Sequence, residues 1–300
     1  MPAPRSVSRL ALLALASCAT SITVPQLDVL NRSLEARTVL LEEGFSLYSP
    51  FDAEGTASYA KLIAEEIKRV AAALEAPAGK PVVAQLVAVV GGPGHTWRSE
   101  GGKLSGSGPI RLPPLHGLRG AADEEDFVVW VAPTMHFVTG PDGPEIRWRV
   151  REEMDRDTIR HEIAHVFLRR LGVRDKLWLT EGVAEEIESM VPEGANLRRQ
   201  PLPAGIEIPP DLVEREGLVR RVLALAQDAD KIAAGETPPD LEGRLLARAL
   251  VRFALERRPG SCAEVVRWLD ARRASEILAL EEEFRAWLRS LPPPAPPGPG

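Results

Sequence analysis

The feature that most constrains the fold is a change of hydrophobic pattern near residue 150. Before this point apolar residues gather in short runs of strand length. After it, apolar residues recur at the spacing of amphipathic helices to about residue 291, with breaks at 201–210 and 235–239. Strands that precede a block of helices are typical of the α+β class. The sequence therefore predicts an α+β protein with a mostly helical C-terminal part.

The part before residue 150 predicts one helix, one long loop and four strands. An apolar stripe predicts a helix over 56–74, and it consists of Leu62, Ile63, Ile67, Val70 and Leu74. Residues 91–120 are rich in Gly and Pro and predict a long loop. The expected strands are 38–48, 81–90, 127–138 and 145–150, the last two joined across 140–144. The second of these is almost wholly apolar and is expected to be a central strand.

The first eighteen residues have the pattern of an export signal. Arg5 and Arg9 precede a seven-residue apolar run at 10–16, which is too short to span a bilayer. The run ends in L-A-S-C at 15–18, which resembles the lipobox of bacterial lipoproteins. This resemblance implies that Cys18 is acylated and becomes the first mature residue. Ordinary signal cleavage and a buried N-terminal helix are the alternatives.

Charge and cysteine content exclude several kinds of partner and site. The formal net charge is −6, and it becomes −8 without a leader that contains Arg5 and Arg9, which argues against a nucleic-acid surface. The mature chain would keep only Cys262, so it has neither an intramolecular disulfide nor a cysteine-type zinc site. Cys262 follows a turn-forming P-G-S and is expected to be a small, partly buried side chain at a helix start.

Residues 161–165 read H-E-I-A-H and match the pattern H-E-x-x-H. On a helix His161 and His165 lie one turn apart, so both imidazoles project from one face and can bind a single Zn²⁺ ion. Glu162 lies about 100° around the helix and can address a water bound to the same ion. Asp157 is expected in the N-cap region. Apolar residues are expected to anchor the helix on its other side: Ile159, Ile163, Val166, Phe167 and Leu171.

A second motif, W-L-T-E-G-V-A-E at 178–185, places Glu181 sixteen residues after His165. With this sequel the chain resembles the gluzincin metallopeptidases, in which a second helix carries the third zinc ligand as the Glu of W-L-x-E-G-x-A. The resemblance implies a zincin-like fold, with a small mixed sheet packed on the active-site helix, and it places the third ligand on Glu181. It also implies that Glu185 orients His161; an ordinary exposed carboxylate is the alternative. Gly172 is expected to end the first helix.

These ligands suit metal-assisted peptide hydrolysis. Three protein ligands leave one position of a tetrahedral zinc open for water, and Glu162 is expected to accept the proton of that water and pass it to the leaving amine. Many gluzincins stabilise the oxyanion with a later Tyr or His, but this chain has no Tyr after Tyr59 and no His after His165. Arg244, Arg248 and His136 are the candidates for this role, each with a purely structural role as its alternative.

The expected organisation follows from these motifs. It comprises a lipoprotein signal peptide at 1–17, a tether at 18–36, a zincin-like catalytic subdomain at 37–200, a helical subdomain at 201–291 and a Pro-rich tail at 292–300. We expect a zinc metallopeptidase with peptide or protein substrates, held by a lipid at the periplasmic side of a bacterial envelope membrane. The strand at 127–138 is expected to offer the substrate a free edge. Two alternatives remain: a weak or inactive metallopeptidase-fold lipoprotein that serves as a binding or assembly module, and a helical envelope protein whose motif is coincidental.

Overall fold

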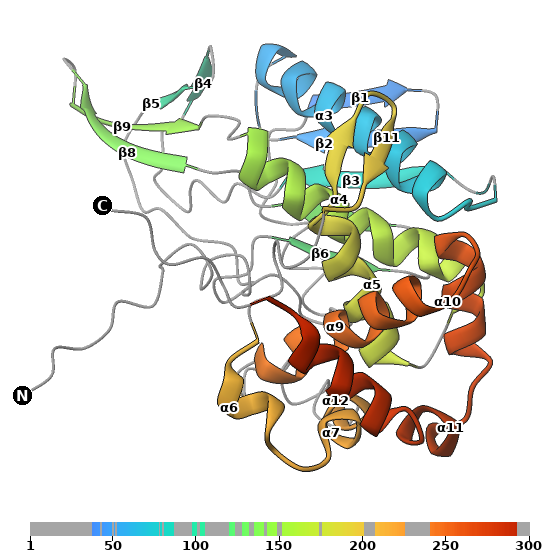
Figure 1. The fold of residues 1–300 in the computed structure, drawn as a ribbon. Helices are drawn as coiled ribbons and strands as arrows, with labels where there is room; N and C mark the ends of the chain where they lie inside the picture. Colours follow the sequence, from blue (N-terminus) through green and yellow to red (C-terminus); the bar gives the residue numbers. More distant parts are fainter. Residues whose placement is uncertain are drawn as a thin grey trace, which may run out of the picture. The chain divides into compact units, whose positions relative to one another are not determined.

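The computed structural model confirms an α+β architecture (Figure 1). It describes residues 38–42, 44–49, 51, 53–77, 79, 81–86, 98–100, 103–105, 120–123, 128–131, 135–140, 143–148, 152–173, 176–200, 208–225 and 241–292. They fall into two compact units, the first within Met1–Ile67 and Ala78–Val166, the second within Lys68–Pro77, Phe167–Ala229 and Pro238–Gly300. In the described part of the chain, no helix is both long and apolar enough to cross a membrane.

The main sheet of the first unit is mixed and has five strands in the order β1-β2-β3-β7-β6. These are β1 (Thr38–Glu42), β2 (Phe45–Ser49), β3 (Val82–Leu86), β7 (Val128–Val131) and β6 (Gly120–Asp123). The three inner strands run parallel, and β1 and β6 pair antiparallel at the two edges. The run at 81–90 therefore supplies the central strand, as its apolar sequence predicts. Val82, Ala84 and Leu86 of β3 are fully buried.

The strand expected over 38–48 is instead a hairpin, so this prediction is wrong. β1 and β2 pair antiparallel, with Leu40 opposite Leu47. Gly44 stands between the two strands with a φ of +89°, a conformation that costs glycine little and other residues much more. The reversal of the chain at this glycine turns one apolar stretch into two neighbouring strands.

The strand expected over 127–138 also divides in two. Its parts are β7 and β8 (Met135–Gly140), which belong to different sheets. Pro133 lies between them in the sequence, and proline has no N–H group to donate to a ladder, which disfavours one continuous strand across this position. Because β7 pairs with both β3 and β6, the free edge predicted for 127–138 does not lie on β7, whereas β8 stands at the end of its sheet.

A second sheet of the first unit has the strand order β4-β5-β9-β8, with β8 at one end. β8 and β9 (Gly143–Trp148) form the predicted hairpin. β4 (Arg98–Glu100) and β5 (Lys103–Ser105) fall inside the segment that was expected to be a long loop. Each of these strands is only three residues long, and alternation cannot be recognised over so few residues. The hydrophobic pattern therefore did not predict them.

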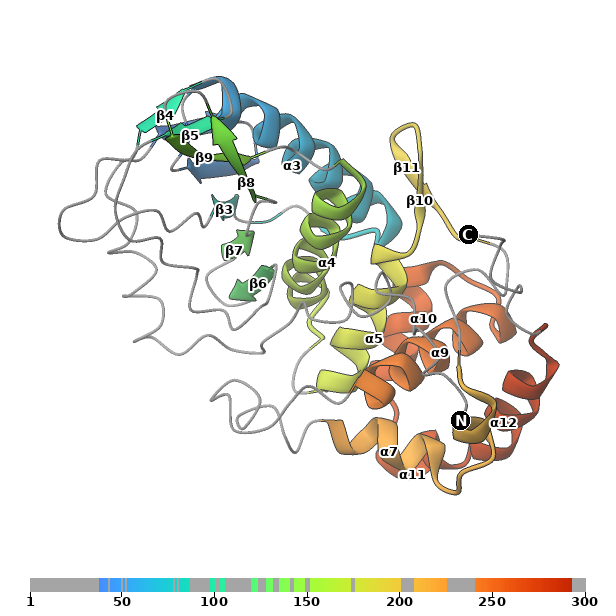
Figure 2. The same ribbon diagram turned by 90° about the vertical axis from the view of Figure 1, so that its left-hand side faces the viewer.

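Two helices accompany the five-stranded sheet, α3 (Ala53–Ala73) and α4 (Glu152–Arg170). Both lie on the same side of β3, β7 and β6 (Figure 2). The apolar stripe predicted for α3 is buried at Leu62, Ile63, Val70 and Leu74. α4 starts earlier than expected, so Asp157 lies inside the helix and the prediction that it belongs to the N-cap region is wrong.

The second unit is mostly helical. Its helices are α5 (Leu177–Glu188), α6 (Pro210–Val213), α7 (Leu218–Ala224), α9 (Leu241–Arg257), α10 (Cys262–Asp270), α11 (Ala274–Leu278) and α12 (Glu281–Ser290). Aromatic rings of α9 and α12 form part of the core, with Phe253 5.7 Å from both Phe284 and Trp287 between ring centroids. A hairpin of β10 (Val191–Glu193) and β11 (Asn196–Arg198) interrupts the stretch that was expected to be helical. Gly194, with a φ of +63°, lies in its turn.

Candidate metal centre

Helix α4 carries the H-E-x-x-H motif, and the three polar side chains of this motif are buried. His161 and Glu162 are 0% exposed and His165 is 5% exposed. The helix ends as predicted at Gly172, which has a φ of +83°. The N–H of Gly172 donates to the carbonyl of Arg169, and that of Val173 donates to the carbonyl of Leu168, the pattern of a glycine-terminated helix.

The two imidazoles lie at a separation that suits a shared ion. Nε2 of His161 and Nε2 of His165 are 3.2 Å apart. Two nitrogens that each bind a tetrahedral zinc at about 2.0–2.1 Å are about 3.3–3.4 Å from one another. The helix backbone and the side-chain rotamers therefore bring both nitrogens close to the ligand spacing of zinc, within a single helical turn.

The third predicted ligand, Glu181, lies on α5, which is buried along most of its length. Two groups of buried or half-buried side chains among the described residues could hold a metal ion, each with ligand atoms within 4.8 Å of one another. One group is His161, His165 and Glu181, and the other is His161, Glu185 and Glu188. The first contains the three ligands that the sequence suggested, and the second contains Glu185, which was expected to orient His161.

Glu188 was not expected at this site. It follows Glu185 by three residues on α5, so the two carboxylates share a face of the helix. This spacing was visible in the sequence. The sequence alone does not show that this position is near the histidines, however, and a Glu on a helix is most often solvent-exposed.

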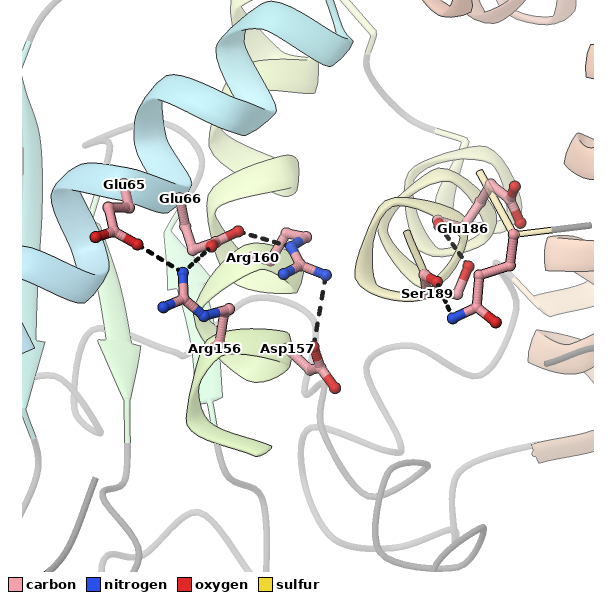
Figure 3. Close-up of polar contacts among 8 residues, drawn as sticks. Glu65, Glu66, Arg156, Asp157, Arg160, Glu186 and Ser189 are labelled. Carbon is pink, nitrogen blue, oxygen red and sulfur yellow. Dashed lines mark hydrogen bonds and ion pairs between the residues drawn. The ribbon is translucent and has the colours of Figure 1, made fainter. Parts of the chain in front are cut away.

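The first half of α4 is held to α3 by a buried ionic cluster (Figure 3). Glu66 of α3 is 0% exposed. One of its carboxylate oxygens accepts from Nη1 of Arg156 at 2.7 Å, and the other accepts from Nε of Arg160 at 2.7 Å. Tyr59 adds a hydrogen bond to Asp155 at 3.0 Å. These contacts fix the two turns of α4 that lead directly into His161.

The arginines considered for oxyanion stabilisation have acidic partners on α5. Nη2 of Arg244 lies 2.5 Å from Oε2 of Glu181, and Nε of Arg248 lies 3.6 Å from Oε2 of Glu186. Their positive charge is therefore compensated locally. The third candidate, His136, lies on β8 in the second sheet of the first unit. Cys18, the expected lipidation site, lies outside the described residues.

Cys262 is a buried structural residue, as its sequence context indicates. It is 8% exposed and opens α10. Ser261 caps this helix, its hydroxyl accepting from the N–H of Glu264 while the Glu264 carboxylate accepts from the N–H of Ser261. Burial raises the pKa of the Cys262 thiol to about 12. The thiolate is therefore scarce at neutral pH, and the side chain is a poor nucleophile.

Comparison with known proteins identifies no relative: no protein-family model matches the chain, and no curated protein or solved structure matches it significantly. The function must therefore be argued from the geometry of these residues.

Proposed function

We propose that this protein is a zinc-dependent metallopeptidase of the gluzincin type. His161, His165 and Glu181 would bind the ion, and Glu162 would act as the general base. The observation that carries the proposal is the group of three buried ligand atoms within 4.8 Å of one another, two of them imidazole nitrogens 3.2 Å apart. Two imidazoles and a carboxylate are a donor set that zinc favours, and three protein ligands are the number found in catalytic zinc sites.

Two features of the fold support the proposal of a zincin-like architecture. The motif helix α4 accompanies a mixed five-stranded sheet, and the Glu181 helix follows α4 in the chain after the turn at Gly172. A small mixed sheet beside the active-site helix is what the resemblance to gluzincins implied. The expected division at residue 200 remains a prediction.

The chemistry follows from the side chains. Zinc, when bound, supplies a Lewis acid that lowers the pKa of water and polarises a peptide carbonyl. The carboxylate of Glu162, one residue from His161 on α4, would accept a proton from water and deliver it to the leaving amine. Glu185, which shares a metal-capable group with His161, would hold that imidazole in the orientation needed for binding. We propose that the substrate is a peptide or a protein.

The location of the protein is proposed from its first eighteen residues alone. Acylation of Cys18 would anchor the mature chain to a membrane at the periplasmic side of a bacterial envelope. Labelling with a radioactive or alkynyl fatty acid is the direct assay for this modification.

A second candidate function is a binding or assembly module that keeps the metallopeptidase fold but hydrolyses peptides weakly or not at all. One observation favours it. The chain has no Tyr or His after His165, and the two later arginines that could replace them are paired with Glu181 and Glu186. An oxyanion donor contributes about 100- to 1000-fold to catalysis, so its loss would leave a slow enzyme.

Chelation separates the candidate functions. We expect the purified protein to cleave members of a peptide library, to lose this activity in a zinc chelator and to regain it when zinc is restored, because hydrolysis needs the ion. Cleavage that persists in the chelator would contradict the proposal. A protein that binds zinc but cleaves no peptide would support the binding module instead.

A further inference from the structure

Helix α5 contains three carboxylates that the fold removes from water. Glu181 and Glu186 are 1% exposed and Glu185 is 7% exposed. An isolated buried carboxylate is so unfavourable that it must be paired or lose its charge. The arginines that pair with these carboxylates lie on one face of α9. They are Arg244, Arg248 and Arg252, which recur at four-residue intervals. We call these three side chains the arginine row.

The arginine row divides its contacts between two kinds of glutamate. Arg248 and Arg252 both lie near Glu186, at 3.6 and 2.7 Å between charged atoms. Glu186 belongs to neither metal-capable group. Arg244 lies 2.5 Å from Glu181 and 3.9 Å from Glu185, and each of these glutamates belongs to one of the groups. Arg244 is therefore the member of the row that addresses the candidate metal centre.

A close approach of the two helices brings these partners within reach. Gly182 follows Glu181, and a Cβ atom at this position would stand 2.7 Å from the carbonyl oxygen of Ala247 on α9. Any larger residue would force the helices apart. Ala247 lies three residues after Arg244, so this close approach of the helices adjoins the Arg244–Glu181 pair. The glycine of the E-G-V-A motif has this packing role beside the predicted ligand.

We infer that Arg244 is a positioning residue for the third metal ligand. Its guanidinium donates to Oε2 of Glu181 and thereby fixes the rotation of the carboxylate before an ion arrives. A carboxylate that is already oriented loses less conformational entropy when it binds a metal. This inference rests on the proposed function, because it assumes that Glu181 is a zinc ligand.

The sign of the effect on zinc affinity distinguishes positioning from simple charge compensation. A nearby guanidinium repels a divalent cation, so removing a charge that only compensates Glu181 would leave zinc binding unchanged or make it tighter. Removing a group that orients the ligand would make zinc binding weaker. Loss of partners that orient metal ligands typically lowers metal affinity 10- to 100-fold.

The test compares Arg244→Gln with Arg252→Gln in the full chain stripped of metal. Zinc affinity is measured by competition with a chromophoric chelator, and folding is checked by circular dichroism. We expect Arg244→Gln to bind zinc about 10- to 100-fold more weakly than the wild type. Arg252→Gln removes an equally buried arginine from the same helix, but its partner is Glu186, so its zinc affinity should equal that of the wild type.

Each outcome decides the matter. Equal or tighter zinc binding in folded Arg244→Gln overturns the inference, and so does an equal loss in both variants. If Arg244→Gln does not fold, Arg244→Lys replaces it, because lysine keeps the charge but not the planar fork. Zinc binding by Arg244→Lys as tight as in the wild type would then refute positioning. A wild type that binds no zinc overturns the proposed function as well, whereas the other failures leave that function intact.

Discussion

Replacing Glu162 by glutamine is expected to lower the rate of peptide hydrolysis about 100- to 10,000-fold, the usual contribution of general acid–base catalysis. Glutamine has nearly the same shape as glutamate, but its amide cannot accept the proton that the reaction must transfer. Glu162 lies between the two histidines in sequence and is fully buried. The zinc content should stay the same, because Glu162 is in neither metal-capable group.

The measurement is kcat/KM on a peptide taken from the library, with zinc counted by mass spectrometry in the same samples. Asp157→Asn is the matched control, because it makes the same carboxylate-to-amide change on α4 one turn before His161, and the Asp157 side chain is 46% exposed. The control should retain wild-type hydrolysis. Equal activity in Glu162→Gln and wild type would end the proposed role of Glu162.

Glu66→Gln is expected to destabilise the fold by about 3–5 kcal/mol, the cost of removing one partner from a buried ion pair. Glu66 is fully buried and binds both Arg156 and Arg160, and the Arg160 side chain is only 1% exposed. A neutral amide would leave Arg160 buried without full compensation. Asp157 lies 3.5 Å from Arg160, but its larger exposure weakens that contact.

Glu65 provides the control for this prediction. It is the preceding residue of α3, its side chain is 34% exposed, and it pairs with Arg156 at 2.9 Å. Glu65→Gln should therefore cost only about 0–1 kcal/mol, as do most exposed ion pairs. Urea denaturation gives both free energies of unfolding. If the two substitutions cost the same, the buried cluster does not stabilise α4 as its geometry indicates.

Local patterns predicted the parts of the fold that depend on residues close in sequence. The α+β class, the central strand at β3, the helix α3, the end of α4 at Gly172 and the β8–β9 hairpin all follow from periodicity or from turn residues. Three of the errors share one cause. Gly44, Pro133 and Gly194 each interrupt an apolar or helical pattern at a single position, and the pattern on both sides looks continuous when it is read by composition.

The same distinction between local and distant residues holds for the candidate site. The spacing of His161 and His165 is a property of one helical turn, so the sequence could predict that they share a face. The partners of the site come from distant residues. Glu66 lies 94 residues before Arg160, and Arg244 lies 63 residues after Glu181, and no local signal connects either pair. The arginine row reads as an ordinary solvated helix face until α9 is placed beside α5.

The most direct test of the account is a crystal structure of the zinc-loaded protein, with anomalous scattering recorded at the zinc absorption edge. We predict one ion bound by Nε2 of His161, Nε2 of His165 and a carboxylate oxygen of Glu181, each at about 2.0–2.2 Å. An ion held without Glu181, or a Glu181 side chain directed away from both imidazoles, would contradict the proposed metal centre.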